Sequence, residues 1–290
     1  MLFNALNLIL FVNRICSRAV KPRAKAINCG INSFSGNYSC YGFCVLHLRS
    51  NMGHKKLIRF EAIKGFPNVL QYPEGMPGQW HGFFKNNNPV TLELACGKGE
   101  YTVGLARLYK DRNFTGVDLK GNRLYVGAKQ CLAEGLSNAA FMRTQIDKIN
   151  NYFLKGEVAA IWITFPDPQL RTSKAKKRLT HPRFLRLYQE ILSKDGFIHL
   201  KTDSPDLYQF TKLIIDLYKL ELTEDYDNVY EQAAISPELQ IKTHYEGLDI
   251  AQSNRIHYLK FRLPAEPLPD IDRQLQEQLK ADEASIERRD

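Results

Sequence analysis

A carboxylate held between two prolines is the residue of this chain whose setting most strongly suggests chemistry. Asp167 lies in Phe165-Pro-Asp-Pro168, directly after the apolar segment 161–164. Proline fixes its own φ and biases the preceding residue toward extended backbone, so the two prolines restrict this acid. Five cations follow within the eight residues from Arg171 to Arg178. A stiff carboxylate in such surroundings suits a site that holds one polar base while the neighbouring surface binds a polyanion.

The charge balance of the whole chain bears on this interpretation. The same segment could be a strand-ending turn followed by a solvated lysine face, because runs of charge are usually exposed. The 290 residues carry 40 Lys and Arg against 31 Asp and Glu, a formal net charge of +9. This excess favours an acidic partner, such as nucleic acid or anionic lipid.

A glycine turn is the second chemically specific feature. Cys96-Gly-Lys-Gly99 follows the short apolar segment 89–95, and Asp118 lies roughly 20 residues beyond the glycines. A dinucleotide fingerprint would have a third glycine where this chain has Thr102, which argues against NAD and for a cofactor without a pyrophosphate. An acid at position 118 can accept both hydroxyls of an adenosine ribose. Together these features favour S-adenosylmethionine, with Glu93 near its amino-acid end; the alternatives are a glycine turn needed only for packing and a helix-capping aspartate.

The elements that must position these residues alternate between strand and helix. Apolar runs predict strands at 89–95, 114–117, 139–142, 158–164, 197–201, 220–223 and 257–263. Helices are predicted at 100–109, 122–134, 147–154, 182–192 and 205–217, with Asn122 capping the second of them. Repeated units of this length predict a parallel sheet covered by helices on both faces, and ligands of such sheets bind outside the carboxyl ends of the strands.

The two ends of the chain differ from this pattern. Residues 1–51 begin with an apolar run far shorter than the ~20 residues that a membrane span needs. Their basic residues follow that run, whereas a signal peptide places them before it. We expect residues 1–51 to be a dispensable extension or an upstream mis-start, residues 52–263 to form the functional domain, and the Pro-, Glu- and Gln-rich tail 264–290 to be a peripheral helix or disordered.

Cysteine and histidine usage predicts neither a disulfide framework nor a metal centre. Six cysteines in a chain of this length do not make a disulfide scaffold, so the compartment is predicted to be reducing, and hence cytoplasmic. Cys40, Cys44 and His47 have an incomplete ligand spacing, because no second pair of ligands follows them. We therefore expect no metal and no membrane association, and a monomer or homodimer.

Several motifs occur in one order along the chain, and this combination is far more specific than any one of them. From about Glu61 to Leu263 the chain resembles the bacterial tRNA (guanine-N7)-methyltransferases. The resemblance rests on Leu92-Glu-Leu-Ala-Cys-Gly-Lys-Gly99, Gly116-Val-Asp118, Phe165-Pro-Asp-Pro168, Lys177-Arg-Leu-Thr180, Lys201-Thr-Asp203 and Thr243-His-Tyr-Glu246. It implies an α/β class I methyltransferase (Rossmann-like) fold: a seven-stranded, mostly parallel sheet with one antiparallel strand and helices on both faces. It also implies methyl transfer from S-adenosylmethionine to N7 of a guanosine in the tRNA variable loop.

The resemblance implies roles for the matching residues. Asp167 matches the catalytic carboxylate at the junction of cofactor and substrate. Cofactor contacts are implied for Glu93, Gly97, Gly99, Asp118, Gln145 and Asp167, and substrate contacts for Arg171, Asp203, Thr243 and Glu246. Three positions depart from the usual pattern: Gln169 replaces a tryptophan, Arg171 a lysine, and Gln145 an Asp or Asn near the adenine.

The chemistry of guanine makes this mechanism coherent. N7 carries a lone pair and no proton, so its attack on a sulfonium methyl group needs alignment rather than a strong base. Asp167 is expected to accept hydrogen bonds from the N1–H and N2–H2 edge of the base. Phosphate contacts are expected from Arg171, Lys174, Lys176, Lys177, Arg178 and Arg183. Two other classes stay open: a small-molecule methyltransferase, and an RNA-binding protein with a vestigial cofactor pocket.

Overall fold

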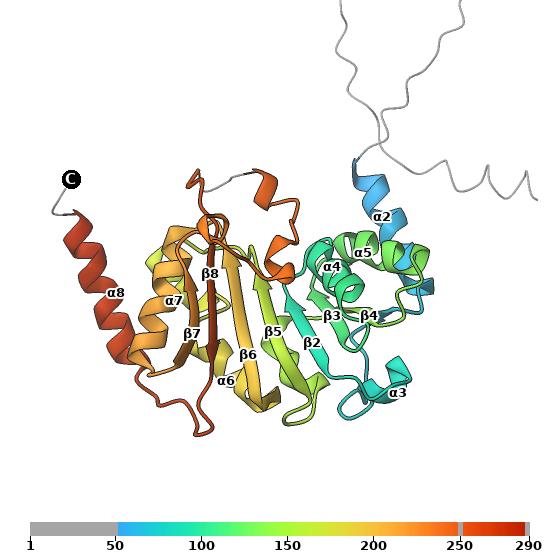
Figure 1. Ribbon diagram of the computed structural model, residues 1–290, viewed down its shortest axis with the longest axis horizontal. Helices are drawn as coiled ribbons and strands as arrows, with labels where there is room; N and C mark the ends of the chain where they lie inside the picture. Colours follow the sequence, from blue (N-terminus) through green and yellow to red (C-terminus); the bar gives the residue numbers. More distant parts are fainter. Residues whose placement is uncertain (1–51, 249–251, 288–290) are drawn as a thin grey trace, which may run out of the picture. The chain divides into compact units, whose positions relative to one another are not determined.

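One mixed sheet organises the part of the chain that the structure describes. The computed structural model describes residues 52–248 and 252–287, so the N-terminal segment 1–51, with the expected extension and Cys40, Cys44 and His47, lies outside the described residues. The sheet order is β1-β4-β3-β2-β5-β6-β8-β7 (Figure 1). Its strands are β1 (Val69–Gln71), β2 (Val90–Leu94), β3 (Asn113–Asp118), β4 (Ala139–Arg143), β5 (Val158–Thr164), β6 (Leu192–Thr202), β7 (Glu221–Tyr226) and β8 (His257–Arg262).

Strand direction confirms a mostly parallel sheet. Every pair from β1 through β6 is parallel, whereas β8 runs antiparallel to both of its neighbours, β6 and β7. The seven expected strands are all present, and β1 adds an eighth at the edge by pairing three residues with β4. The chain leaves β2 toward β3 and β4 and returns to the other side of β2 at β5, so the sheet changes winding direction between β2 and β5. This is the position where open α/β sheets bind ligands.

Helices cover both faces, as expected for buried parallel strands. The α-helices are α2 (Met52–Ala62), α3 (Trp80–Phe84), α4 (Glu100–Leu108), α5 (Gly121–Ala133), α6 (Pro182–Ile191), α7 (Pro205–Leu217) and α8 (Asp272–Glu287). The 3-10 turns are η1 (Ile63–Gly65), η2 (Ile146–Tyr152), η3 (Thr172–Lys177), η4 (Val229–Glu231), η5 (Pro237–Gln240) and η6 (Glu246–Leu248). The side chains of α4 and α5 belong to one buried apolar cluster, and those of α6, α7 and α8 to a second. All five residues of β2 and all six of β3 are buried, including the acidic side chains of Glu93 and Asp118, as expected for central strands covered on both faces.

Some local expectations were wrong. Helix α5 begins at Gly121 with Lys120 at its N-cap, so Asn122 lies inside the first turn and does not cap it. The expected helix 147–154 is the 3-10 segment η2. Strand β6 starts at Leu192, five residues before the expected start at 197, because Leu192 already pairs with Val158 of β5.

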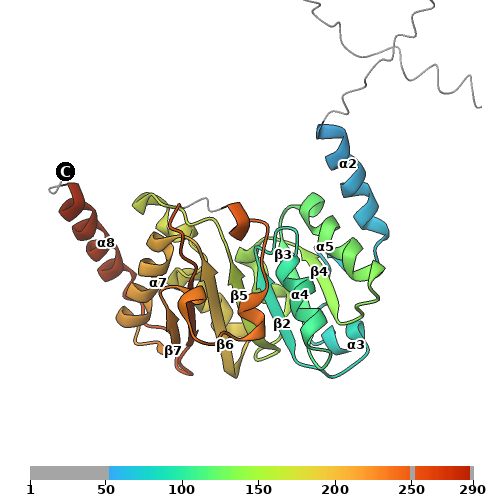
Figure 2. The same cartoon turned by 45° about the horizontal axis from the view of Figure 1, so that its top comes forward.

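The C-terminal tail forms a helix that packs on the domain. Leu275 of α8 is completely buried, and Asp272 accepts hydrogen bonds from Arg186 of α6 and Tyr218 next to α7. Figures 1 and 2 show α8 beside α7, while α2 lies beside α5 at the other end of the sheet. No helix within 52–248 or 252–287 is long and apolar enough to cross a membrane.

We expect Gly127→Ala to destabilise the fold, although alanine is the better helix former by ~1 kcal/mol. A Cβ at Gly127 of α5 would lie 2.6 Å from the backbone oxygen of Lys98 in the glycine turn. Backbone cannot move aside cheaply, so the net cost should be about 1–3 kcal/mol, measured as the free energy of unfolding in urea.

Gly82→Ala in α3 is the matched control, because nothing lies within 4 Å of its Cβ position. It should be neutral or stabilise the protein by up to ~1 kcal/mol. Equal effects of the two substitutions would contradict the close approach of α5 to the glycine turn.

Candidate active site at the carboxyl ends of the strands

A cavity of about 750 Å³ lies where β2, β3, β5 and β6 end, at the change of winding direction. This volume is in the range of small-molecule and cofactor sites. Its walls come from five separate segments of the chain. They comprise Glu93, Ala95, Cys96, Gly97, Glu100, Asp118, Lys120, Arg123, Thr164, Phe165, Pro166, Asp167, Pro168, Leu170, Asp203, Ser204, Pro205, Asp206, Thr243 and Tyr245.

Glu93 of β2 is a buried carboxylate that joins three elements. Its Oε2 accepts hydrogen bonds from the backbone N–H of Thr102 at 2.7 Å and from the hydroxyl of the same residue in α4. Its Oε1 accepts the hydroxyl of Thr164, the last residue of β5, at 2.7 Å. Burial raises the pKa of Glu93 to about 7, although the threonine hydrogen bonds oppose this shift. Thr102, where a dinucleotide site would have glycine, therefore ties α4 to the sheet.

The glycine turn is stabilised by Asp118 at the end of β3. One carboxylate oxygen accepts the N–H of Gly97 at 3.0 Å, and the other accepts the N–H of Lys120 at 2.7 Å. A carboxylate has about four acceptor sites, so Asp118 keeps acceptor capacity toward the cavity. Gly97 has a φ of +57°, and a Cβ there would meet only the ring of Tyr245 at 3.9 Å, so its face opens onto the cavity.

Gly99, for which a cofactor contact was predicted, has a packing role in the structure. Its φ is +74°, and a Cβ at this position would lie 2.4 Å from the ring of Phe141 in β4. Gly99 thus begins α4 in close contact with the sheet, and it is not among the residues that line the cavity.

The loop after β5 presents Asp167 to the cavity. The side chain is exposed, and its Oδ1 accepts the N–H of Gln169 at 3.1 Å. Phe165 and Gln169 on either side have φ values of +46° and +49°, and Ala95, after β2, has +57°. Non-glycine residues in the left-handed region cost of order 1–3 kcal/mol each and cluster at functional sites. Two neighbouring strands therefore both end in strained backbone at this cavity.

Arg178 holds this loop from behind, which contradicts its expected role in phosphate binding. The residue is only 6% exposed, and its guanidinium donates hydrogen bonds to the carbonyl oxygens of Pro168, Gln169 and Leu170 at 3.1–3.3 Å. It also stacks on the ring of Phe210 at 4.4 Å. Burial lowers the pKa of Arg178. The guanidinium of Arg178 therefore binds the loop that carries Asp167 and is not available to a phosphate.

A buried ion pair brings the last wall of the cavity into place. Lys201 near the end of β6 lies 3.0 Å from Glu246, and their side chains are 0% and 5% exposed. The same ammonium group donates to the carbonyl oxygens of Leu239 and Ile241 at 2.9 and 3.0 Å. Glu246 also accepts the hydroxyl of Tyr230. These contacts fix the segment that brings Thr243 and Tyr245 to the cavity.

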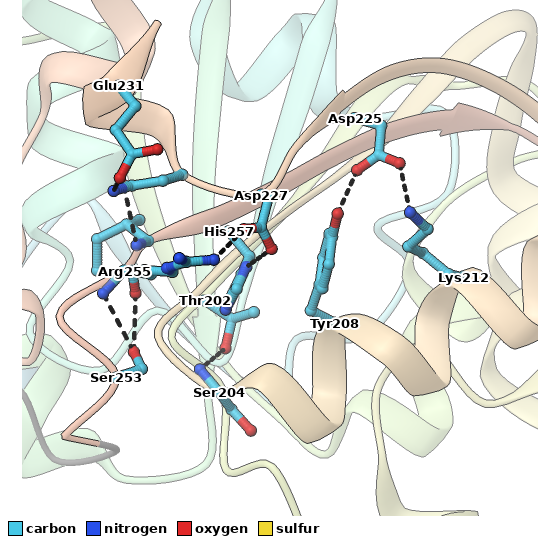
Figure 3. Close-up of polar contacts among 12 residues, drawn as sticks. Thr202, Ser204, Tyr208, Lys212, Asp225, Asp227, Glu231, Ser253, Arg255 and His257 are labelled. Atoms are coloured by element: carbon cyan, nitrogen blue, oxygen red, sulfur yellow. Dashed lines mark hydrogen bonds and ion pairs between the residues drawn. The ribbon is translucent and has the colours of Figure 1, made fainter.

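The backbone of Asp203, two residues after Lys201, is held by a separate contact. The hydroxyl of Ser253 lies 2.8 Å from the Asp203 carbonyl oxygen. Figure 3 shows this neighbourhood, with Asp227 between Arg255 and His257, and the ring of His257 stacked on Tyr208 at 4.4 Å. Burial lowers the pKa of His257, and the neighbouring carboxylate of Asp227 opposes this shift.

The predicted site residues therefore fall into two groups. Glu93, Gly97, Asp118, Asp167, Asp203 and Thr243 line one cavity, whereas Gly99, Gln145, Arg171 and Glu246 do not. Gln145 is exposed at the N-cap of η2, Arg171 is exposed at the N-cap of η3, and Glu246 faces Lys201.

The sequence analysis did not identify all of the charged residues that line the cavity. Glu100 and Asp206 add two carboxylates, and Lys120 and Arg123 are the cations at the cavity. Both acids lie in the first turn of a helix that follows a predicted strand end, which is the signal that could have found them. Within 52–248 and 252–287, no cluster of three His, Cys, Asp or Glu side chains is placed to hold a metal ion.

Comparisons with known proteins show which proteins this chain is similar to. A family model described as "Putative methyltransferase" matches residues 87–259. A tRNA (guanine-N(7)-)-methyltransferase of Porphyromonas gingivalis is 48% identical over 210 residues, which are 68% of this chain and 85% of that protein. An enzyme of the same name from Bacteroides thetaiotaomicron is 42% identical over 236 residues, or 77% of this chain and 93% of the other. The solved 16S rRNA methyltransferase KamB shares the fold, with a TM-score of 0.51 and 12% identity over 68% of this chain and 99% of that one.

We expect Glu93→Gln to remove a pH dependence of stability. With a folded-state pKa of about 7 against 4.5 unfolded, the native state binds more protons between these values, so the free energy of unfolding falls as pH rises through this window. Across this pH window, the free energy of unfolding of the wild type should fall by about 3 kcal/mol more than that of the variant. Urea unfolding at a series of pH values measures this difference. The exposed control Glu74→Gln should give a curve of stability against pH that runs parallel to that of the wild type. If the curve of Glu93→Gln were also parallel to that of the wild type, the burial of this acid would be refuted.

We expect Arg178→Met to cost about 1–3 kcal/mol of unfolding free energy, because three carbonyl oxygens lose their donor. Amide hydrogen exchange in the segment 169–171 should accelerate as well. Arg171→Met, on the same loop but exposed, should stay within about 0.5 kcal/mol. If the two variants matched, Arg178 would not hold the loop.

Proposed function

The chain belongs to the tRNA (guanine-N7)-methyltransferase family, and we propose that it transfers a methyl group from S-adenosylmethionine to N7 of a guanosine in the tRNA variable loop. The observation that carries the proposal is the shared cavity. It joins Asp118, suited to a ribose, with Asp167, suited to a base, across the ends of two strands that flank β2.

The cavity fits S-adenosylmethionine, which supplies an electrophilic methyl group on a sulfonium centre. The open face of Gly97 lets the cofactor approach the backbone closely. Asp118 would accept the ribose hydroxyls with its remaining lone pairs. Glu93, whose oxygens are occupied by Thr102 and Thr164, would fix the wall near the amino-acid end.

The acidic lining suits both ligands. Six carboxylates and two cations line the cavity: Glu93, Glu100, Asp118, Asp167, Asp203 and Asp206 against Lys120 and Arg123. A negative field attracts a sulfonium cation, and carboxylates accept the N–H donors of a guanine edge. The same lining would repel an uncompensated phosphate, so the backbone of the RNA must bind outside it.

Asp167 would position the base. Its Oδ1 is held by Gln169, and Arg178 fixes the carbonyl groups of the same loop. The carboxylate would accept the N1–H and N2–H2 donors of guanine and stabilise the positive charge that develops on the base. Positioning of this kind can contribute up to roughly 7–11 kcal/mol, so the chain needs no general base for N7. Asp203 and Thr243 would hold the other side of the nucleotide.

The phosphate contacts would come from the exposed part of the basic segment. Arg171, Lys174, Lys176 and Lys177 are exposed, whereas Arg183 is partly engaged by Asp147 at 2.8 Å. The expected site of action is the cytoplasm, where tRNA is available and where the buried thiols of Cys96 and Cys131 stay reduced. Residues 52–263 would carry the activity as a monomer or homodimer.

We expect Asp167→Asn to lower turnover at least ~100-fold while binding of S-adenosylmethionine is retained, because five other acidic side chains still line the cavity and the lost charge is the one that faces the base. The assay measures methyl transfer to a tRNA transcript and locates the modified base. Asp216→Asn on the exposed side of α7 is the control and should leave turnover intact.

A change in the tRNA substrate provides a second test of the proposed function. A transcript without the variable-loop guanosine should accept no methyl group. Near-normal turnover of Asp167→Asn would refute its role, tRNA binding without methylation would favour the RNA-binding alternative, and transfer only to small nucleophiles would favour the small-molecule methyltransferase.

A further inference from the structure

A second pocket lies between the basic segment and the C-terminal helix. It has a volume of about 500 Å³ and shares no lining residue with the active-site cavity. Its walls are Arg171, Thr172, Ser173, Ala175, Lys176 and His181 on one side, and Leu275, Gln276, Leu279 and Lys280 of α8 on the other.

The chemistry of this pocket matches an anion. Arg171, Lys176 and Lys280 supply three cations, and Thr172, Ser173 and Gln276 supply neutral donors. None of the described lining residues is acidic. This contrasts with the active-site cavity, where six carboxylates outnumber two cations.

His181 is the most deeply buried polar residue of the pocket lining. The residue is 2% exposed, and its Nδ1 accepts the N–H of Arg183 at 3.1 Å, which leaves the ring proton on Nε2. Burial lowers the pKa of His181 to about 4, so the ring is a neutral donor at physiological pH.

The α8 wall is held in place by specific contacts. Arg186 of α6 forms two hydrogen bonds to the carboxylate of Asp272, at 2.7 and 3.1 Å, and a third to the carbonyl oxygen of Pro269. Tyr218 donates to the same carboxylate at 2.6 Å. Leu275 is completely buried one turn further on, so Lys280 extends from an anchored helix.

The position of the pocket relates it to the reaction. Arg171 lines it, and the preceding residue, Leu170, lines the active-site cavity. Consecutive Cα atoms are about 3.8 Å apart, so the two sites meet at this loop. A nucleotide in the acidic cavity must place its neighbouring phosphates outside it.

We propose that the pocket between η3 and α8 binds a backbone phosphodiester of the RNA substrate, so that the C-terminal helix forms part of the RNA-binding surface. This rests on the proposed function for the identity of the RNA. It assigns a role to a tail segment that lies beyond the residues matched by the family model.

The test compares Lys280→Gln with Arg273→Gln in the full-length protein. Both residues lie on α8 and lose one charge, but Arg273 is 93% exposed, pairs with Glu277, and does not line the pocket. We expect Lys280→Gln to weaken tRNA binding and to reduce the slope of log affinity against log salt by about 1, whereas Arg273→Gln leaves both unchanged. Lys176→Gln should behave like Lys280→Gln.

Equal tRNA affinities of Lys280→Gln and Arg273→Gln would overturn the proposal. Binding of inorganic phosphate by the two proteins gives a second criterion. If the wild type bound phosphate and Lys280→Gln did not, but both bound tRNA with equal affinity, the pocket would serve a free anion and the proposal would be overturned. Methylation of tRNA by the wild type is measured separately. Its absence would refute the proposed function, whereas the comparison of binding variants tests the pocket alone.

Discussion

The buried carboxylate of Glu93 is the interaction on which the arrangement of the site depends. It accepts hydrogen bonds from Thr102 at the start of α4 and from Thr164 at the end of β5, so it fixes the glycine turn relative to the loop that carries Asp167. Burying an acid is costly, and the raised pKa of about 7 records that cost. The wall proposed to bind the cofactor and the wall proposed to bind the substrate are thereby joined through a single side chain.

Two buried cations also fix the walls of the cavity. Arg178 binds three consecutive carbonyl groups of the loop behind Asp167, and Lys201 binds two carbonyl groups and Glu246 beneath the segment of Thr243. A buried charge is expensive to desolvate, but removing its hydrogen-bond partners is strongly destabilising. The contacts of Arg178 hold the loop after β5, which allows Phe165 and Gln169 to persist in left-handed backbone beside the cavity.

Charge is divided between two regions of the surface. The cavity is acidic, which suits a sulfonium cofactor and the donor edge of a base, and the exposed part of the basic segment lies outside it. A polyanion can therefore approach with its phosphates on the cations while one base enters the acidic cavity. The separation follows from topology, because the acids lie at strand ends and the exposed cations lie on the segment after Leu170.

The sequence by itself determined the alternation of strands and helices, the parallel sheet, and the meeting of Asp118 and Asp167 at one edge. These features follow from local periodicity and from the rule that parallel strands end at the same side of a sheet. The tertiary structure alone decided that Arg178 is buried while Arg171 is exposed, although both belong to one run of cations. It also decided that Glu246 pairs with Lys201, 45 residues away, and that α8 packs against α6 and η3. Such choices depend on contacts between segments distant in the chain, and residue type and spacing carry no information about which of several similar charges finds a buried partner.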